Sequence, residues 1–174
     1  MVSATNVFVS TYTYQADTTA VIEPYYENST LGTTSSPLVN TQISQPSGSG
    51  TSYITKRTTQ YLWSPQFGNG QSLPSGILRL DFWASGTSSL AISVYATNAA
   101  GSSVNTLGSS SVTMAKTETE YVLNFTIPAT NVPVSGYISV SFSLASGKAS
   151  PISIYWGASQ ETNFQIEEFR GVVD

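Results

Sequence analysis

The sequence predicts an all-β protein, a jelly-roll-like β-sandwich of about ten strands with an N-terminal strand arm. Apolar and polar residues alternate in many short runs, as in "YISVSFSL" at residues 137–144. Thr, Ser, Val, Ile and Tyr, which favour strands, prevail along the chain. No window shows the i, i+3, i+4, i+7 spacing of an amphipathic helix, and turn residues separate the runs.

Each run of this kind is read as one strand. The expected strands lie at residues 5–14, 19–26, 38–44, 51–63, 76–84, 90–97, 110–114, 120–127, 137–144, 151–156 and 163–169. The turns between them carry Gly, Asn and Ser, as at residues 47–50, 68–70, 85–87, 98–101 and 146–148. Regular spacing of strands and turns favours a sandwich or barrel over a βα fold.

The alternation also predicts which side chains face the core. The inward rows are Leu78, Leu80, Phe82; Leu90, Ile92, Val94; Tyr121, Leu123, Phe125, Ile127; Ile138, Val140, Phe142, Leu144; and Ile152, Ile154, Trp156. The same alternation predicts that Ser139, Ser141 and Ser143 lie on the opposite face, toward water.

Two regions are expected, an arm at residues 1–49 and a sandwich at residues 50–174. "NVFVSTYTYQ" reads as a strand, and the polar stretch after it, rich in Gly, Ser and Pro, reads as extended chain. Such a strand either folds back as an edge strand or pairs with a neighbouring molecule. In the second case Val7, Phe8, Val9, Tyr12 and Tyr14 would form the inter-subunit strand.

Composition excludes several classes of function. Only 9% of the residues are charged, against the usual quarter or so, and the net charge is −4. The chain has no basic stripe for nucleic acid, no apolar run long enough for a membrane span and no visible signal peptide. Because it lacks Cys and His, disulfides and imidazole chemistry are excluded, and we expect no enzyme activity, no cofactor and no metal site.

The carboxylates do not occur in a pattern that indicates catalysis or calcium binding. Asp81 is expected to form an outward, same-face charge pair with Arg79 rather than to act as a catalytic acid. No G-x-S-x-G motif and no calcium-loop motif occurs.

Outward aromatic residues suggest a second kind of site. Parity places Trp83, Tyr95 and Tyr155 outward, where they form either a platform for a sugar ring or an interface covered by another strand or subunit. Two N-x-[ST] sequons, at Asn28 and Asn124, are candidate glycosylation sites.

The stretches "YLWSPQFGNG", "LRLDFWASGTSSLAISVYAT" and "IYWG…TNF" carry a resemblance. Over about residues 50–170 the chain resembles Ser/Thr-rich jelly-roll proteins on the surfaces of archaea and some bacteria. Some of these are similar to subunits of archaeal threads and bundling pili, in which a strand of one subunit completes the sheet of the next. The resemblance implies a structural role and a donor strand at residues 5–14.

The expected function is therefore that of a non-enzymatic subunit of an extracellular filament or surface assembly, polymerising with copies of itself by β-strand addition. Two alternatives remain open: a virion coat or decoration protein, and a carbohydrate-binding module with glycans as partners. The expected location is the cell surface or extracellular space, or alternatively a virion.

Overall fold

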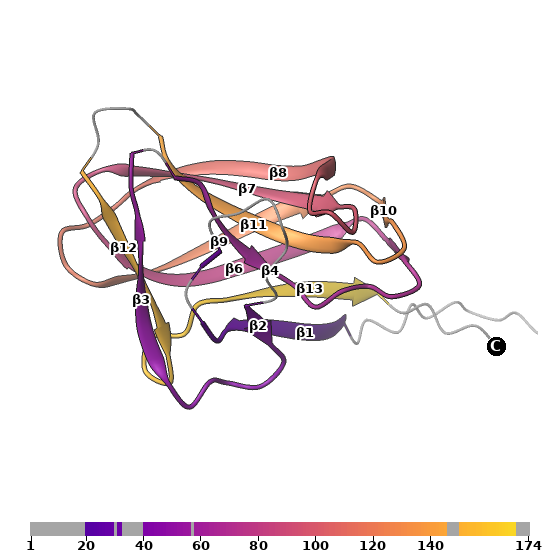
Figure 1. The fold of residues 1–174 in the computed structure, drawn as a ribbon, viewed down its shortest axis with the longest axis horizontal. Helices are drawn as coiled ribbons and strands as arrows, with labels where there is room; N and C mark the ends of the chain where they lie inside the picture. Colours follow the sequence, from indigo (N-terminus) through magenta and orange to yellow (C-terminus); the bar gives the residue numbers. More distant parts are fainter. Residues whose placement is uncertain (1–19, 30, 33–39, 57, 146–149, 170–174) are drawn as a thin grey trace, which may run out of the picture.

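The chain folds into two main antiparallel sheets that lie face to face, as Figure 1 shows, with a separate two-stranded pair. The computed structural model describes residues 20–29, 31–32, 40–56, 58–145 and 150–169. These residues form thirteen strands and no helix, so the predicted all-β, jelly-roll-like sandwich is confirmed. Within the same residues no helix has the length and apolarity needed to cross a membrane.

The larger sheet has seven strands, in the order β2-β1-β13-β6-β12-β3, with β9 also paired to β6. They are β1 (Ala20–Glu27), β2 (Thr41–Gln42), β3 (Ser49–Ile54), β6 (Gly76–Ser85), β9 (Thr119–Ile127), β12 (Ile152–Gly157) and β13 (Asn163–Phe169). Because β9 occupies one edge of β6 along almost its whole length, β13 and β12 share the other edge. β13 pairs with residues 78–81 of β6 and β12 with residues 83–85, so the sheet forks at this edge.

The smaller sheet has four strands in the order β4-β11-β7-β8. They are β4 (Gln60–Trp63), β7 (Ser89–Thr97), β8 (Ser103–Thr113) and β11 (Tyr137–Leu144). A separate pair joins β5 (Gln71–Leu73) and β10 (Thr130–Val132). No Asp, Glu, Lys or Arg occurs in the four strands of the smaller sheet, so this sheet is uncharged.

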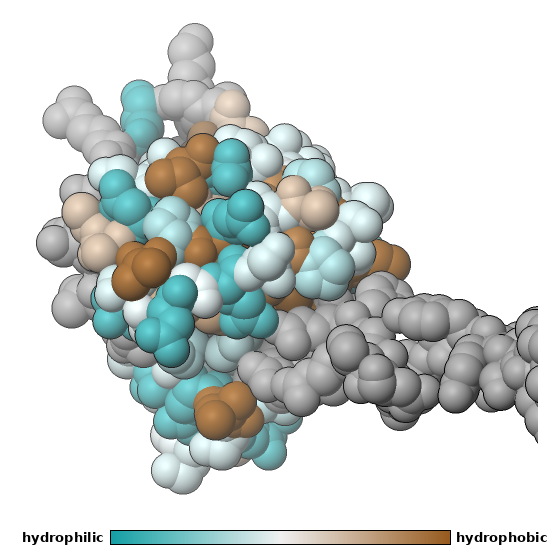
Figure 2. Space-filling view, turned by 90° about the vertical axis from the view of Figure 1, so that its right-hand side faces the viewer, coloured by the Kyte–Doolittle hydropathy of each residue, from teal (hydrophilic) through white to brown (hydrophobic). Residues whose placement is uncertain are grey.

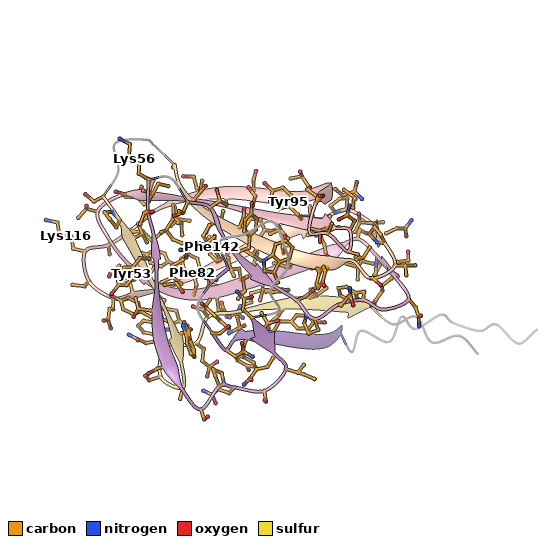
Figure 3. The ribbon with its side chains drawn as sticks, viewed as in Figure 1. Tyr53, Lys56, Phe82, Tyr95, Lys116 and Phe142 are labelled. Carbon is orange, nitrogen blue, oxygen red and sulfur yellow. The ribbon has the colours of Figure 1, made fainter. Side chains whose placement is uncertain are left out.

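The inner faces of the two sheets bury one apolar core. Phe82 of β6 lies at its centre, fully buried, with its ring 6.0 Å from that of Phe142 of β11 and 5.3 Å from that of Tyr121 of β9. Figure 3 shows Phe82 and Phe142 between the two layers. The predicted inward rows are buried apart from four members at the margin, which are half-buried: Tyr121, Leu123, Leu144 and Trp156.

Some predicted strand boundaries were wrong. The expected strand at residues 51–63 is two strands, β3 and β4, in different sheets, separated by a turn in which the Thr58 amide donates to the Thr55 carbonyl. β8 begins at Ser103 rather than at residue 110, and β5 and β10 were not predicted.

Two of the three serines expected to face water on β11 are buried, and the third, Ser143, is half-buried. Ser139 is fully buried and Ser141 nearly so, although both point away from the core. β11 is an inner strand of its sheet, and Trp63 lies directly opposite Ser139 in the register. A small uncharged side chain suits this position because a buried charge without a partner would be costly.

β1 and β2 place Ala20–Glu27 and Thr41–Gln42 in the larger sheet. β1 pairs along its length with β13, and β2 pairs with β1. The predicted inter-subunit strand, with Val7, Phe8, Val9, Tyr12 and Tyr14, lies outside the described residues.

Candidate functional site

Three aromatic side chains share the outer face of the larger sheet. Tyr155 of β12 lies directly opposite Trp83 of β6, and Tyr53 of β3 lies opposite Ser153, two residues from Tyr155. Residues at i and i+2 of a strand point to the same face, and so do direct cross-strand partners. Tyr53, Tyr155 and Trp83 therefore lie on one face, and we name them the aromatic row. Tyr53 is 59% exposed, and the other two are half-buried.

The middle residue of the row is held in place by a hydrogen bond. The Tyr155 hydroxyl lies 2.8 Å from the Ser85 hydroxyl, on the neighbouring strand. The row therefore combines a fixed central ring with a more exposed ring at its β3 end, where Figure 3 labels Tyr53.

The row ends at a hollow where the sheet forks. Its volume is about 350 Å³, and the loop between β12 and β13 forms one wall. The side chains that give it chemical character are aromatic, acidic or amide: Trp83, Asp81, Glu120, Glu161, Asn163 and Gln165. The register explains how they meet, since Trp83 lies opposite Glu120 of β9, and Asp81 lies opposite Asn163 of β13.

The loop at residues 158–162 depends on Gly157. Its φ of 140° lies in a region that favours glycine, and a Cβ there would lie 2.5–2.7 Å from Ser49 and the Gly48 carbonyl oxygen. Gln45 anchors the loop, because its side-chain amide donates to the Ala158 carbonyl at 3.0 Å and also to the Glu161 carboxylate. The loop therefore holds Glu161 at the rim of the hollow.

The charges of the hollow are mostly negative. Arg79 Nε donates to Asp81 Oδ1 at 3.1 Å, which confirms the expected same-face pair. The Arg79 side chain is 46% exposed, so this pair adds little stability. Its structural effect is to orient the Asp81 carboxylate. In the floor of the hollow, Gln165 Nε2 donates to Asn163 Oδ1 at 3.2 Å.

The expected outward aromatics do not all share one face. Trp83 and Tyr155 do, but Tyr95 lies on β7 of the smaller sheet, on the other side of the sandwich. Figure 3 shows Tyr95 near β7 and far from Tyr53. Alternation along one strand defines inside and outside but not which of two sheets the strand joins.

The pKa of Tyr61, near Tyr95 on the smaller sheet, is raised. The main cause is burial, and the second is the neighbouring Tyr95.

The two sequon asparagines differ in their surroundings. Asn124 is exposed on the outer face of β9, opposite Arg79. Asn28 is half-buried, and its Nδ2 donates to Gln42 Oε1 at 3.2 Å. Of the two, Asn124 is the one whose amide nitrogen is free to receive a glycan.

A larger open hollow, of about 470 Å³, lies beside β8 and β10. Its lining is uncharged and has no aromatic ring: Ser72, Asn105, Thr106, Pro128, Ala129, Thr130 and Asn131. Asn105 Nδ2 already donates to Thr130 Oγ1 at 3.1 Å. The smaller hollow therefore has more of the chemistry that could recognise a ligand. In the described part of the chain, no group of three or more Asp and Glu side chains is placed to hold a metal ion.

Scattered apolar residues elsewhere on the surface form no alternative site. Apart from Tyr53, the exposed large ones among the described residues are Ile43, Ile77, Val104, Val122 and Val134, which come from different elements. Figure 2 shows the apolar residues of one face as separate spots among hydrophilic ones.

Comparison with known proteins shows the fold alone. No protein-family model matches the sequence, and no curated protein matches it. The chain superposes on a CocE/NonD family hydrolase from Staphylococcus aureus with a TM-score of 0.68 and 10% identity, over 86% of this chain and 37% of the hydrolase. An α-amino acid ester hydrolase gives 0.55 and 7%, over 82% of this chain and 35% of that one. The chain thus spans little more than a third of either hydrolase.

A more distant likeness is to TmCBM61, a carbohydrate-binding module solved with β-1,4-galactotriose. The TM-score is 0.36 and the identity 16%, over 68% of this chain and 69% of the module. A score this low carries no argument about the site. The chain is a β-sandwich domain similar in fold to a domain-sized part of these hydrolases.

Proposed function

We propose that this protein is a non-enzymatic binding domain that holds a carbohydrate on the aromatic row and in the adjoining hollow. The observation that carries the proposal is the meeting of Tyr53, Tyr155 and Trp83 with a polar hollow on one outer face. A pyranose ring covers an aromatic side chain with its apolar face, while its hydroxyl groups bond to carboxylates and amides at the edge. The face supplies both kinds of group side by side.

The proposal assigns no catalysis to this face. The chain has no His and no Cys, and the most buried carboxylate of the hollow, Asp81, is engaged by Arg79. The likeness to hydrolases is one of fold over about a third of their length, so their activity is not carried over.

Replacing the aromatic residue at the hollow tests the proposal. We expect Trp83→Ala to lose at least about fivefold in affinity for a neutral polysaccharide, because stacking on one ring contributes roughly 1–3 kcal/mol by area. The measurement is retardation in native gels that contain one polysaccharide each, across a panel of β-linked glucans, galactans and xylans.

Tyr95→Ala is the matched control, since Tyr95 is a half-buried aromatic residue on the other sheet. It should migrate like the wild type in every gel. Retardation that Tyr95→Ala abolishes and Trp83→Ala leaves intact would move the site to the smaller sheet and contradict the proposal.

One observation favours a second candidate, a self-assembling subunit of an extracellular filament, a surface layer or a virion coat. β8 is eleven residues long, has no charged residue or proline, and pairs only with β7 among the described strands. Soluble β-proteins usually protect such an edge with charge, proline or a covering element. This free edge could accept an extended strand from another copy, as the resemblance to thread and bundling-pilus subunits implies.

A lysine on this edge tests the second candidate. We expect Ser109→Lys, at an exposed position of β8, to prevent filaments that the wild type forms, because an edge lysine opposes strand addition. Thr87→Lys, at an exposed turn position, adds the same charge away from the edge and should leave assembly unchanged. Negative-stain electron microscopy provides the readout; filaments formed equally by both variants would exclude β8 as the acceptor.

A further inference from the structure

We infer that the hollow beside Trp83 selects a sugar that carries a free amine over neutral and acidic sugars of the same linkage. The inference rests on the proposed function and adds the chemical class of the ligand. It is carried by the unequal charge of the hollow and by two buried polar side chains that open into it.

Negative groups outnumber positive ones at the hollow. Three carboxylates line it, those of Asp81, Glu120 and Glu161, and the one described cation paired with any of them is Arg79. Lys56 and Lys116, the other described cations, do not line it. An anionic sugar would therefore meet like charges, whereas an ammonium group would meet opposite ones.

Two of the lining residues are buried and keep unused bonding capacity, although the Asp81 side chain taken alone is 12% exposed. Asp81 is 8% exposed and Asn163 4% exposed. Arg79 occupies Asp81 Oδ1, and Gln165 occupies Asn163 Oδ1, which leaves Asp81 Oδ2 and Asn163 Nδ2 without a partner among the described residues. Neither atom is fully buried, and both belong to residues that line the hollow.

The two free atoms have different preferences. Asp81 Oδ2 is an acceptor that an ammonium or hydroxyl donor would satisfy, and Asn163 Nδ2 is a donor that suits a sugar hydroxyl or ring oxygen. Trp83 adds a π-face at the same place, which attracts a cation as well as an apolar C–H surface. A glucosamine-type residue offers an ammonium group, hydroxyl groups and a C–H face together, and so matches all three.

The test compares three β-1,4-linked hexamers that differ only at C2: cellohexaose with a hydroxyl, the glucosamine hexamer with an amine, and its N-acetylated form. By isothermal titration calorimetry at about 20 mM salt, we expect the glucosamine hexamer to bind about tenfold more tightly than cellohexaose. The advantage should shrink to about twofold at roughly 0.5 M NaCl, because salt screens exposed charges.

Variants separate charge from stacking. Glu120→Gln and Glu161→Gln should each weaken binding of the glucosamine hexamer more than binding of cellohexaose, whereas Trp83→Ala should weaken all three hexamers. Glu118→Gln is the matched control: Glu118 is an exposed carboxylate outside the hollow that accepts a bond from Gln160. It should keep the wild-type preference.

The outcomes distinguish the two proposals. Equal affinity for the three hexamers would overturn the amine preference and leave carbohydrate binding in place. Binding of neither the hexamers nor any gel polysaccharide would overturn both. Hexalysine that binds as tightly as the glucosamine hexamer and is unaffected by Trp83→Ala would also overturn the inference, because it would show a general cation surface instead of a sugar site.

Discussion

Phe82→Ala is expected to lower the free energy of unfolding by about 3–5 kcal/mol, a large part of the roughly 5–15 kcal/mol that stabilises a typical domain. Phe82 is fully buried and contacts rings from both sheets, Tyr121 at 5.3 Å and Phe142 at 6.0 Å. Removing the ring leaves a cavity between the layers and ends two aromatic contacts at once. Urea denaturation followed by intrinsic fluorescence would measure the change.

Two variants show whether the loss comes from the cavity. Phe82→Leu keeps most of the volume and should cost about 1–2 kcal/mol. Tyr53→Ala removes an exposed ring and should change stability by no more than about 0.5 kcal/mol. If Phe82→Ala cost no more than Tyr53→Ala, the sheets would not be packed through this ring and the described core would be wrong.

The sequence predicted the strands that carry regular alternation and missed those that do not. Residues 137–144 alternate strictly and form β11 over the same residues. β8 reads "SVNTLGSSSVT", whose first half has no apolar period, and so its beginning was missed. The turn between β3 and β4 contains neither Gly nor Pro, which explains why two strands of different sheets were read as one.

The candidate site was predictable only in part. Alternation along the strands correctly placed Trp83 and Tyr155 on the outer face. Ser52 and Ile54 are buried on either side of Tyr53, so the same reasoning would have placed Tyr53 on the outer face as well. The hollow itself was not predictable, because it arises where β6 changes its neighbour from β13 to β12. Nothing local in the sequence of Glu161 or Asn163 indicates that they meet Trp83, since strand order is a property of the whole sheet.

Glu27 is a further feature without a sequence signal, and it bears on stability. It is fully buried near the end of β1, where Ser52 Oγ donates to Oε1 at 3.4 Å and Oε2 has no partner among the described residues. Burial raises the pKa of this carboxyl well above its ordinary value, and the hydrogen bond from Ser52 lowers it only in part. From the adjoining strands, Thr41 of β2 lies opposite it, and the Thr162 carbonyl before β13 accepts its backbone amide.

The sign of the pH dependence follows from this shift. Below the ordinary pKa of glutamate, near 4.3, Glu27 is protonated in both states and folding keeps its full stability. As the pH rises, the unfolded chain releases the proton first, so the free energy of unfolding falls until the pH passes the raised pKa of the folded state. Each unit of pKa difference corresponds to about 1.4 kcal/mol.

Glu27→Gln should therefore flatten the stability profile. We expect the wild type to lose stability as the pH rises above the ordinary pKa of glutamate, and the variant to lose less, since it has no proton to release at this position. Near pH 5 the variant should be no more stable than the wild type, because its buried amide protons lack partners. At about pH 8 the variant should be the more stable of the two. The folded wild type must then either bury a charged carboxylate or keep a proton that the unfolded chain has released.

Urea denaturation at several pH values provides the measurement, and the difference between the two proteins at each pH cancels the carboxyls that they share. Glu118→Gln is the matched control, because Glu118 is exposed and its loss should leave the wild-type profile unchanged. Parallel profiles for the wild type and Glu27→Gln would show that Glu27 titrates as it does in the unfolded chain, which would require water or a cation to reach Oε2. A reversal with pH would instead show that the folded protein keeps this carboxyl protonated at a pH at which the unfolded chain has released the proton.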